Sequence, residues 1–192
     1  RKFTELPVLI KLIDAAKDLS IQVHPDDDYA RAHEGQNGKT EMWYVLSAEP
    51  DAFLYCGFSR DISRDELKRR IADNTLPEVL RRVNVKAGDT VFIPAGTIHA
   101  ICRGIVVAEV QQSSNVTYRV YDYGRLGADG QPRDLIGVLG LGAQQQDGHV
   151  RRQIQDARKV HVRRQPQRLH DQRAGDLAEA QQAAGVKSHR DN

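Results

Sequence analysis

The stretch that decides the fold is Gly88–His99, which reads GDTVFIPAGTIH. Its β-branched and aromatic run, Thr90–Ile93, predicts a strand, and Pro94 and Gly96 predict a tight turn directly after it. Because Pro94 fixes φ and Gly96 accepts a positive φ, the chain reverses there and brings His99 to the start of the next strand. A histidine held in this way is suited to bind a metal ion. The alternative is a histidine that serves only the structure of the turn.

Similar short strands recur over the first two thirds of the chain. Runs of β-branched or aromatic residues alternate with turns rich in Gly, Pro, Asn and Asp, which is typical of β-sandwiches and small barrels. The predicted strands are Ser20–Val23, Met42–Leu46, Ala52–Cys56, Val83–Val85, Thr90–Ile93, Gly104–Gln111 and Thr117–Tyr121, with a short helical turn over Leu76–Arg82.

Two helical inserts interrupt these strands. The acidic residues of Pro25–Asp28 favour the start of a helix that runs to about His33. Ser63 and Glu66 form a capping box, which opens a second helix through Ile71. The sequence therefore predicts an all-β fold with short helical inserts.

Composition restricts the class of protein. The chain has 192 residues, 40% hydrophobic and 28% charged, with a formal net charge of +2. One globular domain fits this length, and the small net charge disfavours a nucleic-acid binder with a broad basic surface. No apolar run approaches the roughly twenty residues that span a bilayer, so no membrane segment is expected. Cys56 and Cys102 form no CxxC pair or disulfide framework, which favours the cytoplasm. Because the chain begins at Arg1 and its only methionine is Met42, we expect a piece of a longer protein.

The last third of the chain differs in composition from the rest. Every Phe, Tyr and Trp lies at or before Tyr123, and 134–192 is rich in Gln, Arg and Ala. We therefore expect a core domain over 1–133, itself open to being incomplete, and a tail over 134–192 that is irregular, disordered or partly helical. A basic RNA-binding arm is one alternative, which interspersed acids and the lack of aromatics disfavour. A corrupted or out-of-frame end is the other alternative.

A row of polar residues lies in LSIQVHP, residues 19–25. Alternation along a strand points Ser20, Gln22 and His24 to one face, opposite the two aliphatic residues between them. Such a row is costly in an interior unless it is satisfied, and a bound cation with its substrate would satisfy it. The alternative is that this face is solvated.

A carboxylate and an amine lie two residues apart in GKTEMWYV, residues 38–45. Lys39 and Glu41 share a strand face by the same period. In an interior they perturb each other's pKa, which is useful for proton transfer, whereas on a surface they form an ion pair worth little.

Four side chains from these stretches form a mixed nitrogen and oxygen set without a thiolate: Gln22, His24, Glu41 and His99. Two imidazoles, one carboxylate and one amide favour Zn²⁺, with Mn²⁺ and Fe²⁺ as alternatives. A coordination position left for water or substrate would make the site catalytic.

A predicted hairpin carries further charged residues, namely Glu109, Arg119 and Arg125. Arg119 is a candidate to stabilise an oxyanion, and Arg125 a candidate to bind a phosphate, because arginine keeps its charge and forms bidentate contacts. The alternative is that both arginines lie on a solvated face.

Together these stretches resemble type I mannose-6-phosphate isomerases, which are zinc-dependent members of the cupin superfamily. The similarity runs from about Leu6 to Arg133 and includes, in the family's order, Leu19–Asp27, Gly38–Tyr44, Phe92–Ala100 and Tyr118–Asp122. It implies a cupin or jelly-roll β-sandwich. Family members continue past the equivalent of Arg133 into a second β-sandwich half, which the tail does not resemble.

The resemblance also implies roles for single residues and an activity. It gives one Zn²⁺ per chain with the ligands Gln22, His24, Glu41 and His99. It makes Arg119 the active-site arginine and Lys39 and Glu109 the proton-handling candidates, with Ser20 and Arg125 at the sugar phosphate. The implied reaction interconverts mannose 6-phosphate and fructose 6-phosphate through an enediol or enediolate in the cytoplasm. The alternatives are a metal-binding cupin with another sugar-related activity and a truncated, inactive isomerase.

Overall fold

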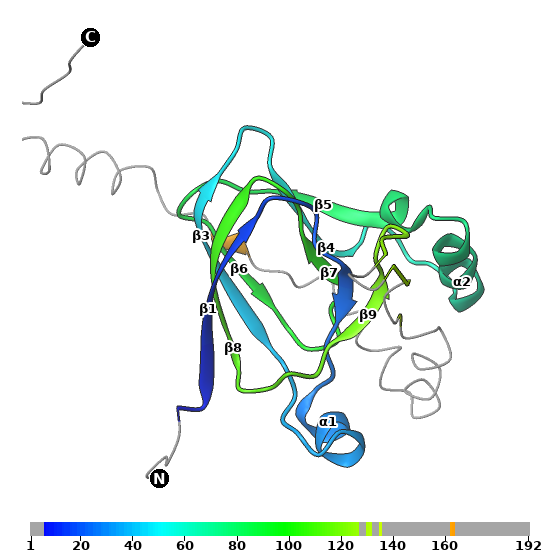
Figure 1. The fold of residues 1–192 in the computed structure, drawn as a ribbon, viewed down its shortest axis with the longest axis horizontal. Helices are drawn as coiled ribbons and strands as arrows, with labels where there is room; N and C mark the ends of the chain where they lie inside the picture. The colour runs from blue at the N-terminus through cyan, green and yellow to red at the C-terminus, as the bar shows by residue number, and fades with distance from the viewer. Residues whose placement is uncertain (1–5, 127–129, 132–134, 136–161, 164–192) are drawn as a thin grey trace, which may run out of the picture.

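Over the residues that it describes, the structure is a β-sandwich of two antiparallel five-stranded sheets (Figure 1). It is a computed structural model, and it describes residues 6–126, 130–131, 135 and 162–163. The elements in chain order are β1 (Val8–Ala15), β2 (Ile21–Val23), α1 (Asp27–His33), β3 (Glu41–Ala48), β4 (Phe53–Phe58), α2 (Arg64–Ala72), the 3₁₀ turn Leu76–Val79, β5 (Leu80–Asn84), β6 (Thr90–Ile93), β7 (His99–Ile101), β8 (Ile105–Gln112), β9 (Tyr118–Tyr121) and β10 (Val162–Arg163). The predicted all-β sandwich with short helical inserts is confirmed.

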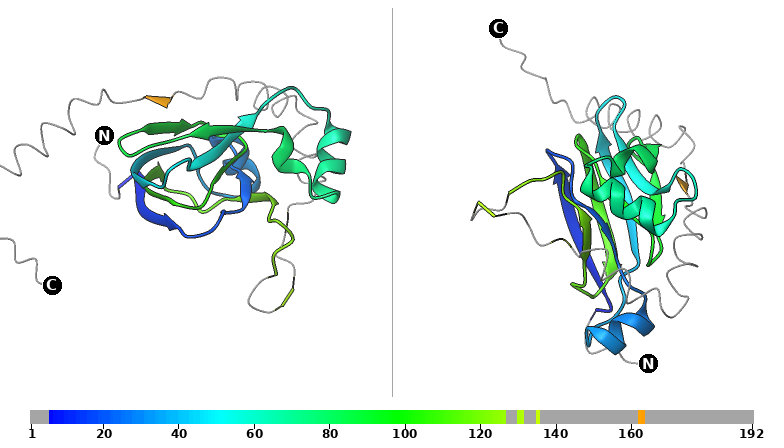
Figure 2. Two further views of the ribbon diagram at one scale, coloured as in Figure 1. Left: turned by 90° about the horizontal axis from the view of Figure 1, so that it is seen from above. Right: turned by 90° about the vertical axis from the view of Figure 1, so that its right-hand side faces the viewer.

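Apart from β4 and β5, which pair with each other in one sheet, strands that follow one another in the sequence lie in different sheets. Sheet A has the order β1-β8-β3-β6-β10, and sheet B has the order β5-β4-β7-β2-β9. The two sheets face each other across the core when the molecule is seen from above (Figure 2). Side chains from both sheets therefore meet between them.

The interior is apolar over most of its extent and polar near one end. Along β8, Ile105 and Val107 are buried in the apolar core, whereas the next two inward residues, Glu109 and Gln111, are buried polar residues. Gln111 is the register partner of Glu41, the first residue of β3. The polar end of the interior thus lies where β3 begins and β8 ends.

Both helices begin with the predicted caps. Asp26 accepts a hydrogen bond from Tyr29 N at 2.9 Å, and Ser63 accepts one from Glu66 N at 3.1 Å. In Figure 1, α1 lies at the lower end of the sandwich and α2 lies at its side. The helix α2 buries Leu67 against the cluster that contains Leu76.

Two elements differ from the sequence-based expectation. Strand β1 was not among the predicted strands, yet all eight of its residues pair with β8. Its apolar run does not alternate cleanly, because Ile10 and Leu12 are exposed although both are aliphatic. The turn expected over Leu76–Arg82 ends early, because β5 already begins at Leu80 and pairs with β4.

The expected tail, 134–192, contributes a strand to the described structure. In β10, Val162 and Arg163 pair with Val91 and Thr90 of β6 at the edge of sheet A. The expectation that 134–192 is irregular, disordered or partly helical stays a prediction for the rest of the tail. Apart from Val162, Arg163 and Leu135, the tail lies outside the described residues, as does the helical segment expected within it.

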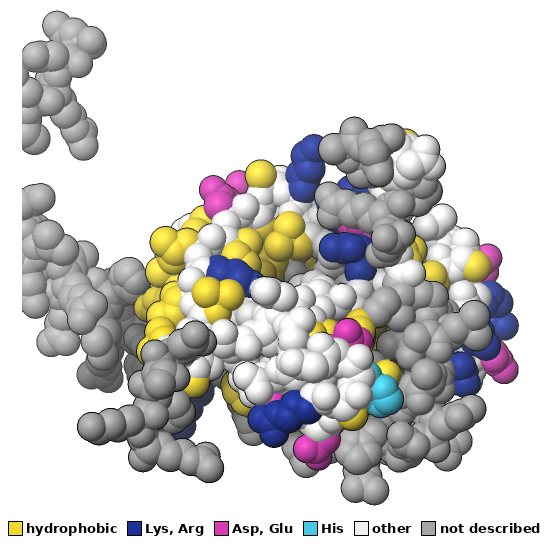
Figure 3. All heavy atoms as spheres, turned by 60° about the horizontal axis from the view of Figure 1, so that its bottom comes forward, with side chains coloured by type: hydrophobic (Ala, Val, Ile, Leu, Met, Phe, Trp, Pro, Cys, Tyr) yellow, Lys and Arg dark blue, Asp and Glu magenta, His cyan; other side chains and the backbone are white. Residues whose placement is uncertain are grey.

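The outer face of sheet A carries exposed apolar side chains. Leu12 is 76% exposed and Phe92 is 43% exposed. Hydrophobic side chains gather at the left of Figure 3, the side on which sheet A lies in Figure 1. In the part of the chain that the structure describes, no helix has the length and apolar character needed to cross a bilayer.

Candidate metal centre

The register of sheet B aligns three predicted site residues in one row. Gln22 on β2 is the register partner of His99 on β7 and of Arg119 on β9. Directly opposed residues in antiparallel strands share a face, and the His99 side chain is buried between the sheets. The register therefore places Gln22 and Arg119 on the inner face beside His99.

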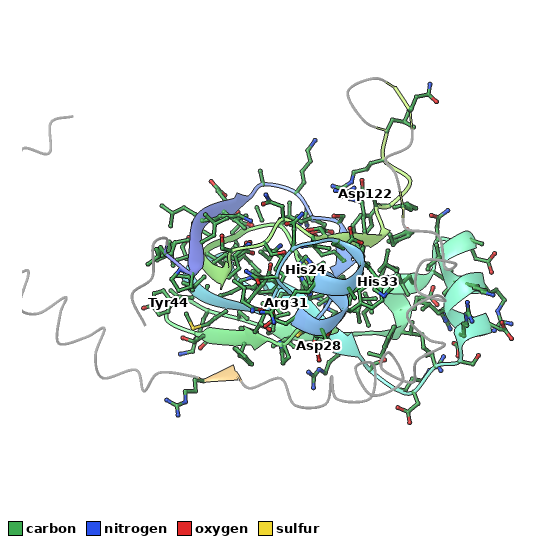
Figure 4. All side chains as sticks on the ribbon, turned by 90° about the horizontal axis from the view of Figure 1, so that it is seen from below. His24, Asp28, Arg31, His33, Tyr44 and Asp122 are labelled. Atoms are coloured by element: carbon green, nitrogen blue, oxygen red, sulfur yellow. The ribbon has the colours of Figure 1, made fainter. Side chains whose placement is uncertain are left out.

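Three of the four predicted metal ligands converge at the polar end of the interior. His24 Nε2 lies 3.2 Å from Glu41 Oε1, and His99 Nε2 lies 3.6 Å from Glu41 Oε2. One ligand atom from each of the three residues lies within 4.8 Å of the other two, and all three side chains are buried. Glu41 comes from sheet A and His99 from sheet B, so the cluster joins the two sheets. In the view from below, His24 lies near the middle of the sandwich, at the end where α1 lies (Figure 4).

Backbone carbonyls orient both imidazoles toward Glu41. His24 Nδ1 lies 3.0 Å from Val116 O, and His99 Nδ1 lies 2.8 Å from Thr97 O. A carbonyl accepts only from N–H, so each Nδ1 carries a proton, and in the neutral ring each Nε2 presents a lone pair. Burial lowers the pKa of His24, and burial lowers the pKa of His99 to about 4. Both rings are thus neutral near pH 7, which is the form that binds metals.

Glu41 is held as a carboxylate in the same cluster. Burial by itself raises the pKa of Glu41, but the contact with His24 and the charges of His99, His24 and Lys39 outweigh this effect. They hold the pKa of Glu41 well below its usual range. Two nitrogen lone pairs and a carboxylate are the donor types that Zn²⁺ takes in proteins.

The unsatisfied atoms of the cluster fit a cation. Among the described residues, His99 Nε2 and both oxygens of Glu41 lack a hydrogen bond of good geometry, although all three atoms are buried. Ligand atoms about 2.1 Å from a tetrahedral metal lie roughly 3.4 Å from each other. The separations of 3.2 and 3.6 Å match that spacing, so His24, Glu41 and His99 fit a divalent ion.

Lys39 lies in this cluster, beside Glu41 as its spacing predicts. Its Nζ is 2.8 Å from Glu41 Oε1 and 3.2 Å from His24 Nε2, and the side chain is buried. His24 Nε2 cannot accept a proton from Lys39 and bind a metal with the same lone pair. Metal binding therefore requires the ammonium to move away from His24.

Glu109 lies one strand away from Glu41 and is also buried. Its Oε2 accepts a hydrogen bond from Trp43 Nε1 at 3.1 Å, and its Oε1 lies 3.3 Å from Lys11 Nζ. The Trp43 ring packs edge-on against His99, with ring centroids 5.4 Å apart. Glu109 thus faces the same interior as the metal cluster.

Lys11 was not recognised in the sequence. It is the register partner of Glu109, and its Nζ also donates to Gln111 Oε1 at 2.5 Å. The available signal was a single lysine within the apolar run of β1, and that run itself was not read as a strand.

Ser20 and Arg125, the two residues predicted to contact a phosphate, form hydrogen bonds or ion pairs with other residues of the chain. Ser20 Oγ accepts a hydrogen bond from Arg119 Nε at 3.3 Å. Arg125 donates from Nη1 to Asp18 O at 2.6 Å, and its guanidinium forms an ion pair with Asp122. In Figure 4, Asp122 lies farther from the middle of the sandwich than His24. The structure does not bring Arg125 into the metal cluster, and its role stays a prediction.

The sequence of this chain is similar to a known protein family and to known enzymes. The family described as phosphomannose isomerase type I, catalytic domain, matches residues 1–58. A probable mannose-6-phosphate isomerase, GmuF, of Bacillus subtilis is 50% identical over 130 residues, which are 67% of this chain and 41% of that protein. This chain belongs to the type I phosphomannose isomerase family. Two of the three clustered ligands, His24 and Glu41, lie within the matched family segment.

Further members of the family show the same similarity. The mannose-6-phosphate isomerase of Streptococcus mutans is 46% identical over 146 residues, covering 73% of this chain and 46% of that protein. The crystal structure of the mannose 6-phosphate isomerase from Bacillus subtilis superposes with a TM-score of 0.66 at 42% identity, covering 73% of this chain and 46% of that one. This chain of the phosphomannose isomerase family therefore spans less than half the length of each of these three relatives.

Proposed function

We propose that this chain carries the metal-binding part of an enzyme that interconverts mannose 6-phosphate and fructose 6-phosphate. The observation that carries the proposal is the buried convergence of His24, Glu41 and His99 from two sheets, with Lys39 beside them. The relatives at 46–50% identity are mannose-6-phosphate isomerases by name, which supports the choice of substrate.

The proposed cofactor is one Zn²⁺ per chain, held by His24, Glu41 and His99 with Gln22 as the fourth ligand. The register of Gln22 opposite His99 supports its assignment. When bound, Zn²⁺ polarises and orients the oxygens at C1 and C2 of the open-chain sugar. Mn²⁺ and Fe²⁺ are the alternative ions for this donor set.

The reaction moves one proton between two carbons. A base takes the proton from C2 of the aldose, the C–H electron pair forms the C1–C2 double bond, and the oxygen at C1 becomes protonated. The protonated base then gives its proton to C1 of the resulting enediol, while the C2 hydroxyl returns a proton to the group that protonated the oxygen at C1 and becomes the ketone. Lys39 and Glu109 are the proposed proton carriers, because both are buried and face the interior that holds the metal ligands.

Arg119 is the proposed stabiliser of charge on the reacting oxygens. Its place in the row with Gln22 and His99 supports this role. A fixed guanidinium lowers the energy of an enediolate without a proton transfer of its own.

Ser20 and Arg125 are the proposed phosphate contacts. The hydrogen bond between Arg119 and Ser20 Oγ supports a position of this hydroxyl beside the reacting part of the sugar. For Arg125, the proposal requires that a phosphate replaces or joins Asp122 at the guanidinium.

The proposed compartment is the cytoplasm. The support is that Cys56 and Cys102 are free and buried. Burial raises the pKa of both thiols to about 12, so neither is a ready nucleophile.

The experiment is a zinc determination and a coupled assay for fructose 6-phosphate on the purified 192-residue chain. The proposal predicts about one zinc per chain and turnover of mannose 6-phosphate, both lost in His99→Ala. The matched control is His33→Ala, which removes an exposed imidazole on α1. Zinc without turnover would favour the alternative of a truncated, inactive isomerase, because the chain covers only 41% of the GmuF length.

A further inference from the structure

The last residue of β8 fixes the backbone at the start of β3. Gln112 N donates to Thr40 O at 3.1 Å, and the side-chain Oε1 of Gln112 accepts from Thr40 N at 2.8 Å. The regular ladder between β3 and β8 ends one residue earlier, at Glu41 and Gln111. The Gln112 side chain thus supplies the acceptor that another strand residue would have supplied.

The same amide ties this segment to α1. Gln112 Nε2 donates to Asp27 Oδ1 at 3.2 Å, and Asp27 Oδ1 also accepts from Gly38 N at 2.8 Å. Between these two contacts, Lys39 N donates to Pro25 O at 3.0 Å. Three consecutive backbone amides, 38 to 40, are therefore held by acceptors on two other segments.

Gly38 lets the two segments approach this closely. A Cβ at this position would lie 2.4 Å from Asp26 C and from Asp27 N, both of which are backbone atoms. The contact between the start of α1 and the segment before β3 is therefore tight as well as hydrogen-bonded.

These hydrogen bonds fix the backbone next to Lys39 and Glu41, the two residues that flank Thr40. Lys39 and Glu41 meet in the interior with Nζ and Oε1 2.8 Å apart. Lysine has four rotatable side-chain bonds, so the place of its ammonium depends on how firmly its backbone is held. Small displacements of a reacting group cost large factors in rate, and partners behind a metal ligand affect metal affinity.

We propose that Gln112 and Asp27 are positioning residues that together hold Lys39 and Glu41 in place at the metal centre. Neither side chain has a contact with His24, Glu41 or His99 among those described, so both act through the backbone of residues 38–40. The effect on turnover rests on the proposed isomerase function, and the effect on metal binding rests only on the metal centre.

The test compares variants of the full 192-residue chain. Gln112→Leu removes both polar side-chain contacts, Asp27→Ala removes the shared acceptor, and the double variant removes all of them. Asp27→Asn is the conservative control, because its amide oxygen still accepts from Gly38 N and Gln112. Asp28→Ala is the second control, because it removes an exposed acid from the same helical turn.

Three measurements are made on each variant. The first is Co²⁺ affinity together with the visible Co²⁺ spectrum, which reports the geometry of the ligands. The second is hydrogen exchange of amides 38–41 in the metal-free protein. The third is turnover of mannose 6-phosphate, resolved into kcat and KM.

The proposal predicts that Gln112→Leu and Asp27→Ala each weaken Co²⁺ binding about tenfold and shift its absorption bands. Exchange of amides 38–41 rises, and kcat falls about tenfold with KM nearly unchanged. The combined loss in the double variant is smaller than the sum of the two single losses in free energy, because either single variant already removes the contact between Gln112 and Asp27. Asp27→Asn and Asp28→Ala stay within about twofold of the unchanged protein.

Unchanged Co²⁺ spectra and unchanged amide exchange in both single variants would overturn the proposal, as would fully additive losses in the double variant. A wild-type chain without turnover would count against the proposed isomerase function alone, because the cobalt spectrum and amide exchange still decide the positioning role. A wild-type chain that binds no Co²⁺ would remove the metal centre, and with it the part of the proposal that concerns Glu41.

Discussion

The imidazole rings of His24 and His99 lie with their centroids 4.9 Å apart, although the residues are 75 positions apart in the sequence. His24 directly follows β2, and His99 is the first residue of the neighbouring strand β7. Each ring donates its Nδ1 proton to a backbone carbonyl and directs Nε2 toward Glu41. The two Nε2 atoms are thus oriented toward the same carboxylate before any metal ion binds.

The buried histidines predict a pH-dependent stability of the metal-free protein. The pKa of His99 is about 4 in the folded chain against 6.5 for the free side chain. Between these values unfolding takes up a proton, so stability falls as pH falls through this window, by on the order of 3 kcal/mol from His99. His24 acts in the same direction. Urea unfolding at pH 7, 6, 5 and 4 measures the slope. It should flatten in His99→Gln, and an equal slope in both proteins would refute the assignment.

Replacing Arg119 by Ala should abolish turnover without removing the metal. The guanidinium lies in the row of Gln22 and His99 but offers no ligand atom to a cation. The expected loss in kcat is about 10²- to 10³-fold, as for other groups that stabilise an oxyanion. Zinc content measured on the same sample is the control. Arg119→Lys should restore little, and loss of zinc in either variant would contradict the role.

Replacing Lys39 by Met should separate metal binding from turnover. The ammonium lies within 3.2 Å of two candidate ligand atoms and repels a bound cation. Two unit charges 4 Å apart interact by about 1 kcal/mol even in water, so Zn²⁺ should bind about fivefold tighter or more. Turnover should fall at least about 10²-fold if Lys39 carries the proton. A chelator competition assay measures the affinity, with the exposed Lys17→Met as the control. Weaker zinc binding in Lys39→Met would show that Lys39 supports the site rather than competes for it.

Gly38→Ala should destabilise the fold far more than Gly35→Ala. A Cβ at Gly38 meets backbone at 2.4 Å, whereas Gly35 has open space around its Cβ position. Gly38→Ala should cost about 2 kcal/mol or more, and Gly35→Ala about 1 kcal/mol because its φ is +64°. Thermal or urea unfolding of both variants compares the costs. Equal costs would mean that the approach of α1 to the segment before β3 is looser than described.

Local patterns in the sequence were sufficient to predict most elements and to single out the candidate ligands. The turn Pro94–Thr97 and the alternation at Gln22 and His24 depend on neighbouring residues alone, so they could be read directly. The convergence of His24, Glu41 and His99 could be expected only from the family resemblance, because their distance in space depends on the strand order of two sheets.

Other features depend on long-range contacts that no local pattern reveals. Strand β1 has aliphatic residues on its exposed face, so its sequence does not alternate between polar and apolar residues as a half-buried strand would. The strand that pairs with β8 was therefore not predicted, and neither was the position of Lys11 beside Glu109. The hydrogen bonds of the Gln112 side chain join residues up to 85 positions apart. The ion pair between Arg125 and Asp122 was likewise not predicted. A guanidinium binds a phosphate and a carboxylate in the same way, so the residue type of Arg125 does not tell which of the two it binds.

The most direct test of the metal centre is anomalous X-ray diffraction at the zinc edge on crystals of the zinc-loaded chain. We predict one strong anomalous peak about 2.0–2.2 Å from His24 Nε2, His99 Nε2 and a carboxylate oxygen of Glu41, with Lys39 Nζ moved away from His24. A zinc-loaded crystal with no peak between these three side chains, or with its peak at another site, would contradict it.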